Sequence, residues 1–145
     1  MTEPDIDRRP HVGDRLLSLA AGTALDVGPA DLVDVAAAAG FPAVGVWYDA
    51  TTFTPAVARD VRARLDHHGM IALDVEPIML NVGDHQDHGE AIVEAAFEVG
   101  ARHVLVASRQ PDDGAVADRL AQLAQRCAGT DLRLVLEFLP ALATR

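Results

Sequence analysis

The chain has 145 residues, of which 50% are hydrophobic and 23% are charged, and its formal net charge is −10. This composition predicts a folded domain rather than a disordered chain, and the acidic balance argues against nucleic acid as a general partner, because like charges repel a phosphate backbone. The one cysteine, Cys127, excludes an intramolecular disulfide and a cysteine-rich zinc cluster.

The first residues of the chain carry charges of both signs and show no apolar periodicity. We therefore expect a flexible tail over residues 1–13, followed by one folded portion over residues 14–145. The tail lacks the apolar stretch of a signal peptide, and no apolar run reaches the about 20 residues that span a bilayer. These features predict a cytoplasmic protein with no membrane partner.

Short apolar runs then alternate with amphipathic segments. Pro29 and Pro55 suit the first position of a helix, Thr54 and Asp112 suit helix caps, and Gly69 suits a helix end. We expect strands at residues 16–20, 43–47, 70–76, 103–107 and 132–138, and helices at residues 28–40, 55–68, 87–100 and from Asp112 or Asp113 to about Cys127.

The runs recur at intervals of about 30 residues, which is the length of one strand–helix unit. Alternating strands and helices predict a parallel sheet with right-handed crossovers. Two α/β architectures fit: a doubly wound open sheet, or part of an eight-unit barrel, which typically needs about 250 residues.

Side-chain alternation within the strands favours the barrel. In the third strand Asp74 and Glu76 fall on one face together with Ala72, whereas Ile71, Leu73 and Val75 fall on the other. Helices cover both faces of a doubly wound sheet, so two acids on a central strand fit a barrel lumen better. The fifth strand agrees less cleanly, with Leu132, Leu134 and Leu136 opposite Arg133, Val135 and Glu137. We predict a partial (β/α)8 TIM barrel of about five parallel units, without the C-terminal units.

The working residues of such barrels lie at the C-terminal ends of strands, which here means Trp47, Glu76, Ser108, Arg109 and Glu137. Glu137 follows an apolar strand and needs a cation, a metal or a proton, so it is a candidate metal ligand or acid/base group; a structural ion pair is the alternative. Glu76 precedes Pro77, which places it at the expected strand exit as a substrate contact or a loop acid. Trp47 could stack on a sugar ring or fill the barrel mouth, and Arg109 could bind an anion or form a surface ion pair.

Other polar residues have simpler interpretations. The segment Asp84-His85-Gln86-Asp87-His88 contains metal-binding residue types, but it precedes a helix, and we expect capping and loop roles there. Asp74 lies deeper and is expected to be structural. The sequence contains no glycine-rich phosphate loop and no serine nucleophile elbow.

Four segments carry a family likeness: residues 29–46, 71–76, 99–106 and 134–140. In order and spacing they resemble the N-terminal part of xylose-isomerase-like TIM barrels, which include sugar phosphate isomerases/epimerases and related apurinic endonucleases. The resemblance implies a divalent ion (Mn, Mg, Zn or Co) held by a Glu, an Asp, a His and a second Glu. Glu137 matches the first ligand, and the other three would lie after residue 145. We therefore expect a truncated chain that does not hold the ion tightly and is inactive alone.

The resemblance implies a metal-dependent isomerase or epimerase of a sugar or small polyhydroxy carbonyl compound, with Glu137 as catalytic metal ligand. The strand-end positions of Trp47, Glu76 and Arg109 make them the candidate substrate contacts. One alternative is a non-catalytic half-barrel that self-associates through its exposed edges or pairs with a second chain. A further alternative is a related metal-dependent dehydratase or apurinic endonuclease, although the negative charge argues against binding DNA.

Overall fold

The computed structural model describes residues 15–80 and 86–137, so the expected tail at residues 1–13 lies outside the described residues. Five parallel strands form one sheet in the order β1-β2-β3-β4-β5. Their bounds are β1 (Ser18–Leu19), β2 (Ala43–Trp47), β3 (Ile71–Leu80), β4 (His103–Ser108) and β5 (Arg133–Glu137). The connecting elements are η1 (Ala21–Thr23), α1 (Pro29–Ala38), α2 (Pro55–His68), α3 (Gly89–Val99) and α4 (Asp113–Cys127).

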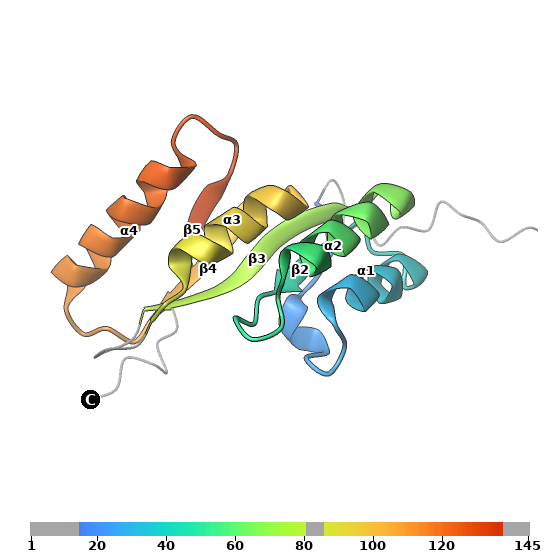
Figure 1. The fold of residues 1–145 in the computed structure, drawn as a ribbon, viewed down its shortest axis with the longest axis horizontal. Helices are drawn as coiled ribbons and strands as arrows, with labels where there is room; N and C mark the ends of the chain where they lie inside the picture. The colour runs from blue at the N-terminus through green and yellow to red at the C-terminus, as the bar shows by residue number, and fades with distance from the viewer. Residues whose placement is uncertain (1–14, 81–85, 138–145) are drawn as a thin grey trace, which may run out of the picture.

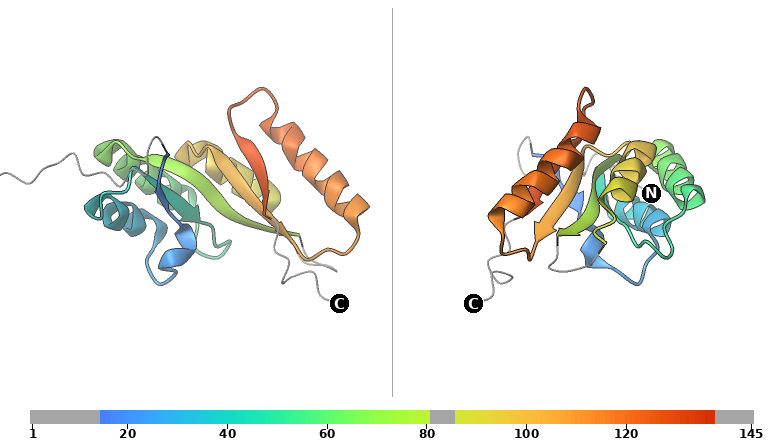
Figure 2. Two further views of the ribbon diagram at one scale, coloured as in Figure 1. Left: turned by 180° about the vertical axis from the view of Figure 1, so that it is seen from behind. Right: turned by 60° about the vertical axis from the view of Figure 1, so that its left-hand side comes forward.

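The strand order identifies the architecture. Each strand pairs with the next strand in the sequence, as consecutive units of a β/α barrel do, whereas a doubly wound sheet reverses direction at a switch point. Within the described residues, the long helices lie over one face of the sheet (Figure 1), and the view from behind in Figure 2 shows the short turn η1 at the opposite face. The predicted partial barrel is therefore confirmed, and we call the face without the long helices the inner face.

The apolar core fills the space between the sheet and the helices. Val44, Val46, Val104 and Val106 from the strands are fully buried there. They meet buried helix residues, namely Leu32, Val33, Val61, Leu65, Ile92, Val93 and Leu123. Burying one such side chain contributes about 1.5–3 kcal/mol, so this layer dominates the stability of the fold. Leu132, just before β5, belongs to the same cluster, and Leu134 and Leu136 of β5 pack against it, which confirms the predicted alternation of this segment.

The helix boundaries follow the capping signals of the sequence. The Thr54 side chain accepts a hydrogen bond from Val57 N–H at 3.3 Å, and α2 ends at Gly69, whose φ of 61° is costly for other residues. The Asp112 side chain accepts from Gly114 and Ala115 N–H at the start of α4. Among the described helices, none is long and apolar enough to cross a membrane.

Strand β3 differs from the expectation. It continues through Pro77 to Leu80, so the predicted strand exit at Glu76 is wrong. Its pairing with β4 shifts register between Val75 and Ile78, and this irregularity accommodates Pro77, which has no N–H to donate to a regular ladder.

A second register shift changes which face the β3 side chains occupy. Val44 pairs with Ala72, but Gly45 pairs with Asp74, so Leu73 is an extra residue on β3. Ala72 and Val75 are consequently both buried in the core, at 2% and 0% exposure, although strict alternation placed them on opposite faces. The prediction that Ala72 faces the lumen was therefore wrong, whereas Asp74 keeps its place beside Gly45.

Candidate functional site on the inner face

Two rows of side chains cross the inner face. The first is set by strand register, in which Gly45 pairs with Asp74, Asp74 with His103, and His103 with Arg133. The second lies nearer the C-terminal ends of the strands, where Trp47 pairs with Glu76, and Ala107 pairs with Glu137. Polar groups from three adjacent strands are thus brought to one surface, at the end of the sheet where barrel chemistry takes place.

Glu76 is the half-buried carboxyl of the second row. Burial raises its pKa above the ordinary glutamate value, and the nearby charges of Asp74 and Glu137 raise it further. The backbone N–H groups of Ala21 and Gly22 hydrogen-bond to this carboxyl and lower the pKa. A carboxyl that keeps its proton to higher pH than an ordinary glutamate is suited to acid/base work.

Asp74 lies below Glu76 in the first row. Its Oδ1 atom is buried, and no residue in the described ranges donates a hydrogen bond to it. Burial is the main cause that raises the Asp74 pKa, and the charge of His103 acts in the opposite direction. His103 Nδ1 lies 3.1 Å from the Leu73 carbonyl oxygen, which can only accept, so this nitrogen carries a proton.

Gly45 permits the close approach of this carboxyl. A Cβ atom at position 45 would lie 2.6 Å from Asp74 Oδ1, 2.9 Å from the Ala21 nitrogen and 3.3 Å from the Ala21 side chain. The turn η1 and the Asp74 carboxyl therefore both pack closely against Gly45, and Ala21 is only 1% exposed. Sequence reasoning missed this arrangement and treated Asp74 as merely structural; a glycine inside a strand was the available signal, because it marks the close approach of other groups.

The structure brings some of the predicted site residues together. Trp47 is half-buried and lies beside Glu76, while Glu137 is exposed at the end of β5 and close enough to influence Glu76. Arg109 lies apart from this pair. Its N–H donates to the carbonyl of Leu80, four residues beyond Glu76 on β3, at 2.7 Å. Ser108 Oγ accepts from Gln110 N–H at 3.1 Å, a local bond in the loop that follows β4.

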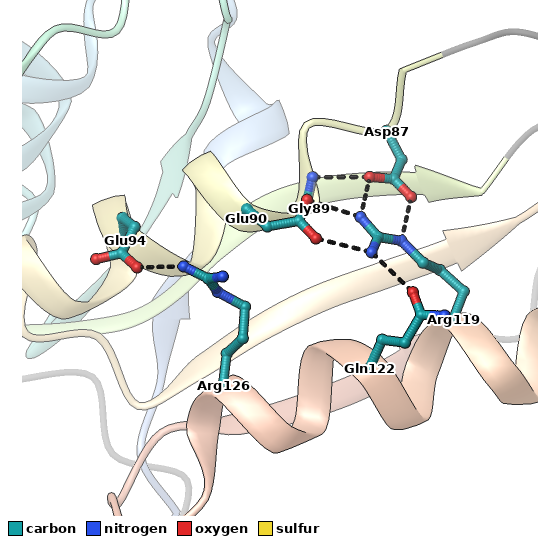
Figure 3. A network of polar contacts seen from close by, with 7 residues as sticks. All are labelled: Asp87, Gly89, Glu90, Glu94, Arg119, Gln122 and Arg126. Carbon is teal, nitrogen blue, oxygen red and sulfur yellow. Dashed lines mark hydrogen bonds and ion pairs between the residues drawn. The ribbon is translucent and has the colours of Figure 1, made fainter.

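Asp87, within the segment considered as a metal cluster, has structural partners instead. Its carboxylate accepts from Gly89 N–H and from two nitrogens of Arg119 on α4, each at 2.8 Å. Arg119 also binds Glu90, and Figure 3 shows its guanidinium between the two carboxylates. This pairing lowers the pKa of Asp87. Asp84 and His85 lie outside the described residues.

The described residues do not form a metal centre by themselves. Across residues 15–80 and 86–137, no three His, Cys, Asp or Glu side chains are grouped closely enough to hold a metal ion. Glu137 lies close enough to Glu76 to raise its pKa, but the described residues supply no third His, Cys, Asp or Glu side chain to complete a ligand group with them. The donor set therefore does not fit a divalent ion.

No family model matches the sequence, and no curated protein matches it. The chain is similar to solved structures. A xylose isomerase-like TIM barrel/4-hydroxyphenylpyruvate dioxygenase fusion protein shares 24% identity over 82% of the chain, with a TM-score of 0.60. An uncharacterised protein from Parabacteroides distasonis shares 13% identity over 89% of the chain, with a TM-score of 0.63. An AP endonuclease, family 2, from Brucella melitensis shares 15% identity over 86%, with a TM-score of 0.64.

These similarities establish a xylose-isomerase-like fold, as the resemblance in the sequence implied. The chain spans 21%, 55% and 56% of the lengths of these three proteins. The inner face of the described strands therefore corresponds to one part of the inner surface of such a barrel.

Proposed function

We propose that this chain, with its xylose-isomerase-like fold, belongs to an enzyme that isomerises or epimerises a sugar or another small polyhydroxy carbonyl compound. The observation that supports this most directly is the pairing of Trp47 with Glu76 on the inner face. An aromatic ring offers an apolar surface to the C–H face of a sugar, and the neighbouring carboxyl has a raised pKa.

The proposed chemistry is proton transfer between adjacent carbons. Glu76 would remove or return a proton at the carbon beside the carbonyl, since its surroundings keep its proton affinity above that of an ordinary glutamate. Trp47 would orient the ring or chain of the substrate against this carboxyl. Arg109 is exposed and farther along the sheet, so it would contact only a longer or phosphorylated substrate.

A divalent ion is part of the expectation from the resemblance, and Glu137 would be its one ligand among the described residues. The donor set of these residues does not complete a metal site, so we derive no step through an ion. The roles given to Glu76 and Trp47 depend on the carboxyl and the ring alone.

A second candidate is endonuclease activity at apurinic sites, which the fold of the Brucella protein brings into consideration. The inner face argues against it, because Asp74, Glu76 and Glu137 would all face a phosphodiester and repel it. A related dehydratase would use the same proton-transfer groups and remains within the proposal.

Self-association as a non-catalytic half-barrel is favoured by one feature, the 40% exposure of the apolar Val135 on β5. Light scattering over a range of protein concentrations tests it: a mass twice that of the 15.4 kDa chain supports association, and a monomer at every concentration rejects it.

Trp47 provides the main experiment, because it is the single tryptophan of the chain. Aldoses, ketoses and their phosphates would be titrated while the Trp47 emission is recorded, with an oligonucleotide bearing an abasic site as the competing ligand. We expect a polyhydroxy carbonyl compound to change the emission, and Glu76→Gln to weaken this binding about tenfold, a loss of about 1.4 kcal/mol.

The matched control is Asp118→Asn on the exposed surface of α4, which should leave the titration unchanged. Deuterium incorporation from D2O into the carbon beside the carbonyl, followed by NMR, then tests proton transfer. A response to the oligonucleotide alone, or equal binding by wild type and Glu76→Gln, would reject the proposal.

A further inference from the structure

Strand β5 is an edge of the sheet. It pairs with β4 on one side, and no other strand of the described residues pairs with it. The Arg133 N–H group donates to the Arg102 carbonyl, beside β4, at 3.0 Å. Because backbone groups alternate along a strand, the N–H and C=O groups of Leu134 and Leu136 face the opposite, outer edge. Such groups are a template for another strand.

The side chains of β5 form a pattern that complements itself. From Arg133 to Glu137 the strand has a cation, a leucine, a valine, a leucine and an anion, with Val135 at the centre. When two such strands run antiparallel with Val135 opposite Val135, each Leu134 lies opposite a Leu136, and each Arg133 lies opposite a Glu137. Every position then meets a cross-strand neighbour that favours pairing.

We propose that two copies of this chain associate through β5, in an antiparallel pair of strands that is centred on Val135 and joins the two sheets about a two-fold axis. The backbone fits this register. Leu134 and Leu136 of opposite copies form hydrogen-bonded pairs, in which both residues exchange N–H···O bonds through their outer groups. Val135 falls in a non-hydrogen-bonded pair, where the side chains of the two strands are closest.

The exposure of the β5 side chains supports this interface. Val135 is apolar yet 40% exposed, and Arg133 and Glu137 are exposed on either side of it. Within the described residues, Arg133 donates only through Nη1, to the carbonyls of Thr130 and Leu132, so its Nε and Nη2 remain for Glu137 of the second copy. Association would therefore give the acidic inner face a guanidinium from the second copy.

The outer side of this edge has room for a second copy. A hollow of about 530 Å³ lies between the end of α4 and the start of β5, and Leu134 lines it together with Ala124 and Ala128. Leu136 of the second copy, opposite Leu134, would fill part of this hollow. Alanine side chains are small, so they allow the two α4 helices to approach each other over the joined strands.

The net charge of the chain opposes association mainly at long range. Each copy has a formal net charge of −10, but repulsion between exposed charges is screened beyond about 8 Å at physiological ionic strength. The edge itself is balanced, since Arg133 and Glu137 carry opposite charges. The inference does not depend on the proposed activity, because the Trp47–Glu76 pair lies on β2 and β3, away from this edge.

Charge exchange at the edge tests the interface. Sedimentation equilibrium of the whole chain, from micromolar to millimolar protein at about 0.15 M salt, would measure the dissociation constant of the dimer. We expect the wild type to dimerise. Arg133→Glu and Glu137→Arg each place like charges opposite one another at both ends of the paired strands, and should raise the dissociation constant about tenfold or more.

Two combinations of these variants distinguish the interface from a general effect of charge. The double variant, Arg133→Glu with Glu137→Arg, should restore the wild-type dissociation constant, because opposite charges face each other again. An equimolar mixture of the two single variants should form a heterodimer for the same reason. A substitution that only damaged the fold would not be rescued in either way.

The remaining variants test the centre of the interface and the specificity of the charge effect. Val135→Lys places two lysines opposite each other at the two-fold axis and should abolish the dimer. Asp26→Arg is the matched control, since it changes the net charge as Glu137→Arg does but lies exposed in the loop before α1. This control should leave the dissociation constant within about threefold of the wild type.

Amide hydrogen exchange locates the contact. The N–H groups of Leu134 and Leu136 should be more protected at high than at low protein concentration, whereas the Arg133 N–H, which is bonded within the chain, should be protected at both. A monomer at every concentration, or single variants that dimerise as the wild type does, would overturn the proposal. So would a double variant and a mixture that both stay monomeric, or a series of higher oligomers, which indicates head-to-tail contacts.

Discussion

Gly45→Ala is the sharpest test of the packing described on the inner face. A glycine in a strand interior normally weakens the strand, so replacing it with alanine at an unobstructed position stabilises a protein by about 0.5–1 kcal/mol. At position 45 the added Cβ would lie 2.6 Å from Asp74 Oδ1 and 2.9 Å from the Ala21 nitrogen, both closer than real Cβ atoms approach other atoms. We therefore expect the opposite sign, a loss of about 1–3 kcal/mol in the free energy of unfolding, which is typical of overpacking.

The assay is urea unfolding at neutral pH, followed by circular dichroism and by the emission of Trp47. Gly22→Ala is the matched control, because Gly22 lies in η1 itself but a Cβ there would meet nothing within 4 Å. This control should change the free energy of unfolding by no more than about 1 kcal/mol, with an unchanged urea dependence. If Gly45→Ala were as stable as the wild type or more stable, the close contact of η1, Gly45 and Asp74 would be refuted.

Four further outcomes follow from the contacts of the helices and the inner face. Arg119→Leu should lower the free energy of unfolding, measured in urea, by about 1.5–3 kcal/mol, because the Asp87 carboxylate loses two charge-assisted hydrogen bonds. Arg126→Leu, its control on the same helix, should cost no more than about 1 kcal/mol, since that ion pair is exposed. The lowered pKa of Asp87 means that its pairing stabilises the fold above the ordinary aspartate pKa and is lost as the pH falls through the folded-state value. Acid titration should therefore destabilise the wild type more than Arg119→Leu, and equal slopes would contradict this. Leu123→Ala should lower the free energy of unfolding by about 2–5 kcal/mol, because the truncated side chain leaves a cavity under α4. A thermal midpoint within error of the wild type would contradict the described core. Glu76→Gln should raise stability at neutral pH relative to the wild type, because it removes a carboxyl whose ionised form is disfavoured by burial.

The sequence predicted the order and type of the elements well, because their signals are local. Thr54, Gly69 and Asp112 end or begin helices through hydrogen bonds and backbone angles within a few residues, and all three have the predicted roles. The alternation in β5 also predicted correctly which of its side chains meet the helices. Such features can be predicted without knowing which distant segments come into contact.

The interior of β3 could not be predicted in the same way. The two register shifts depend on how β2 and β4 pair with β3, and simple alternation placed Ala72 on the wrong face. Pro77 was taken as a strand end, but pairing on both sides carries the strand through it.

The candidate site shows the same division. Trp47, Glu76 and Glu137 were selected by their positions in the strands, and the structure brings the first two together. The packing of Ala21 and Asp74 against Gly45 joins segments that are far apart in the sequence, and the glycine inside β2 was the one local signal for it. Whether Arg109 contacts a substrate stays a prediction, and its place beside Leu80 separates it from the Trp47–Glu76 pair.

The sequential strand order has a consequence for how the chain folds. Because every strand pairs with the next one along the sequence, each step of sheet growth closes a loop of only about 30 residues, and the entropic cost of closure changes little from one unit to the next. Contacts of such short sequence separation favour rapid folding. Assembly can thus proceed by adding one strand and its helix to a growing edge, and a transition state built around β2, β3 and their helices would already contain the surface on which Asp74 and Glu76 lie.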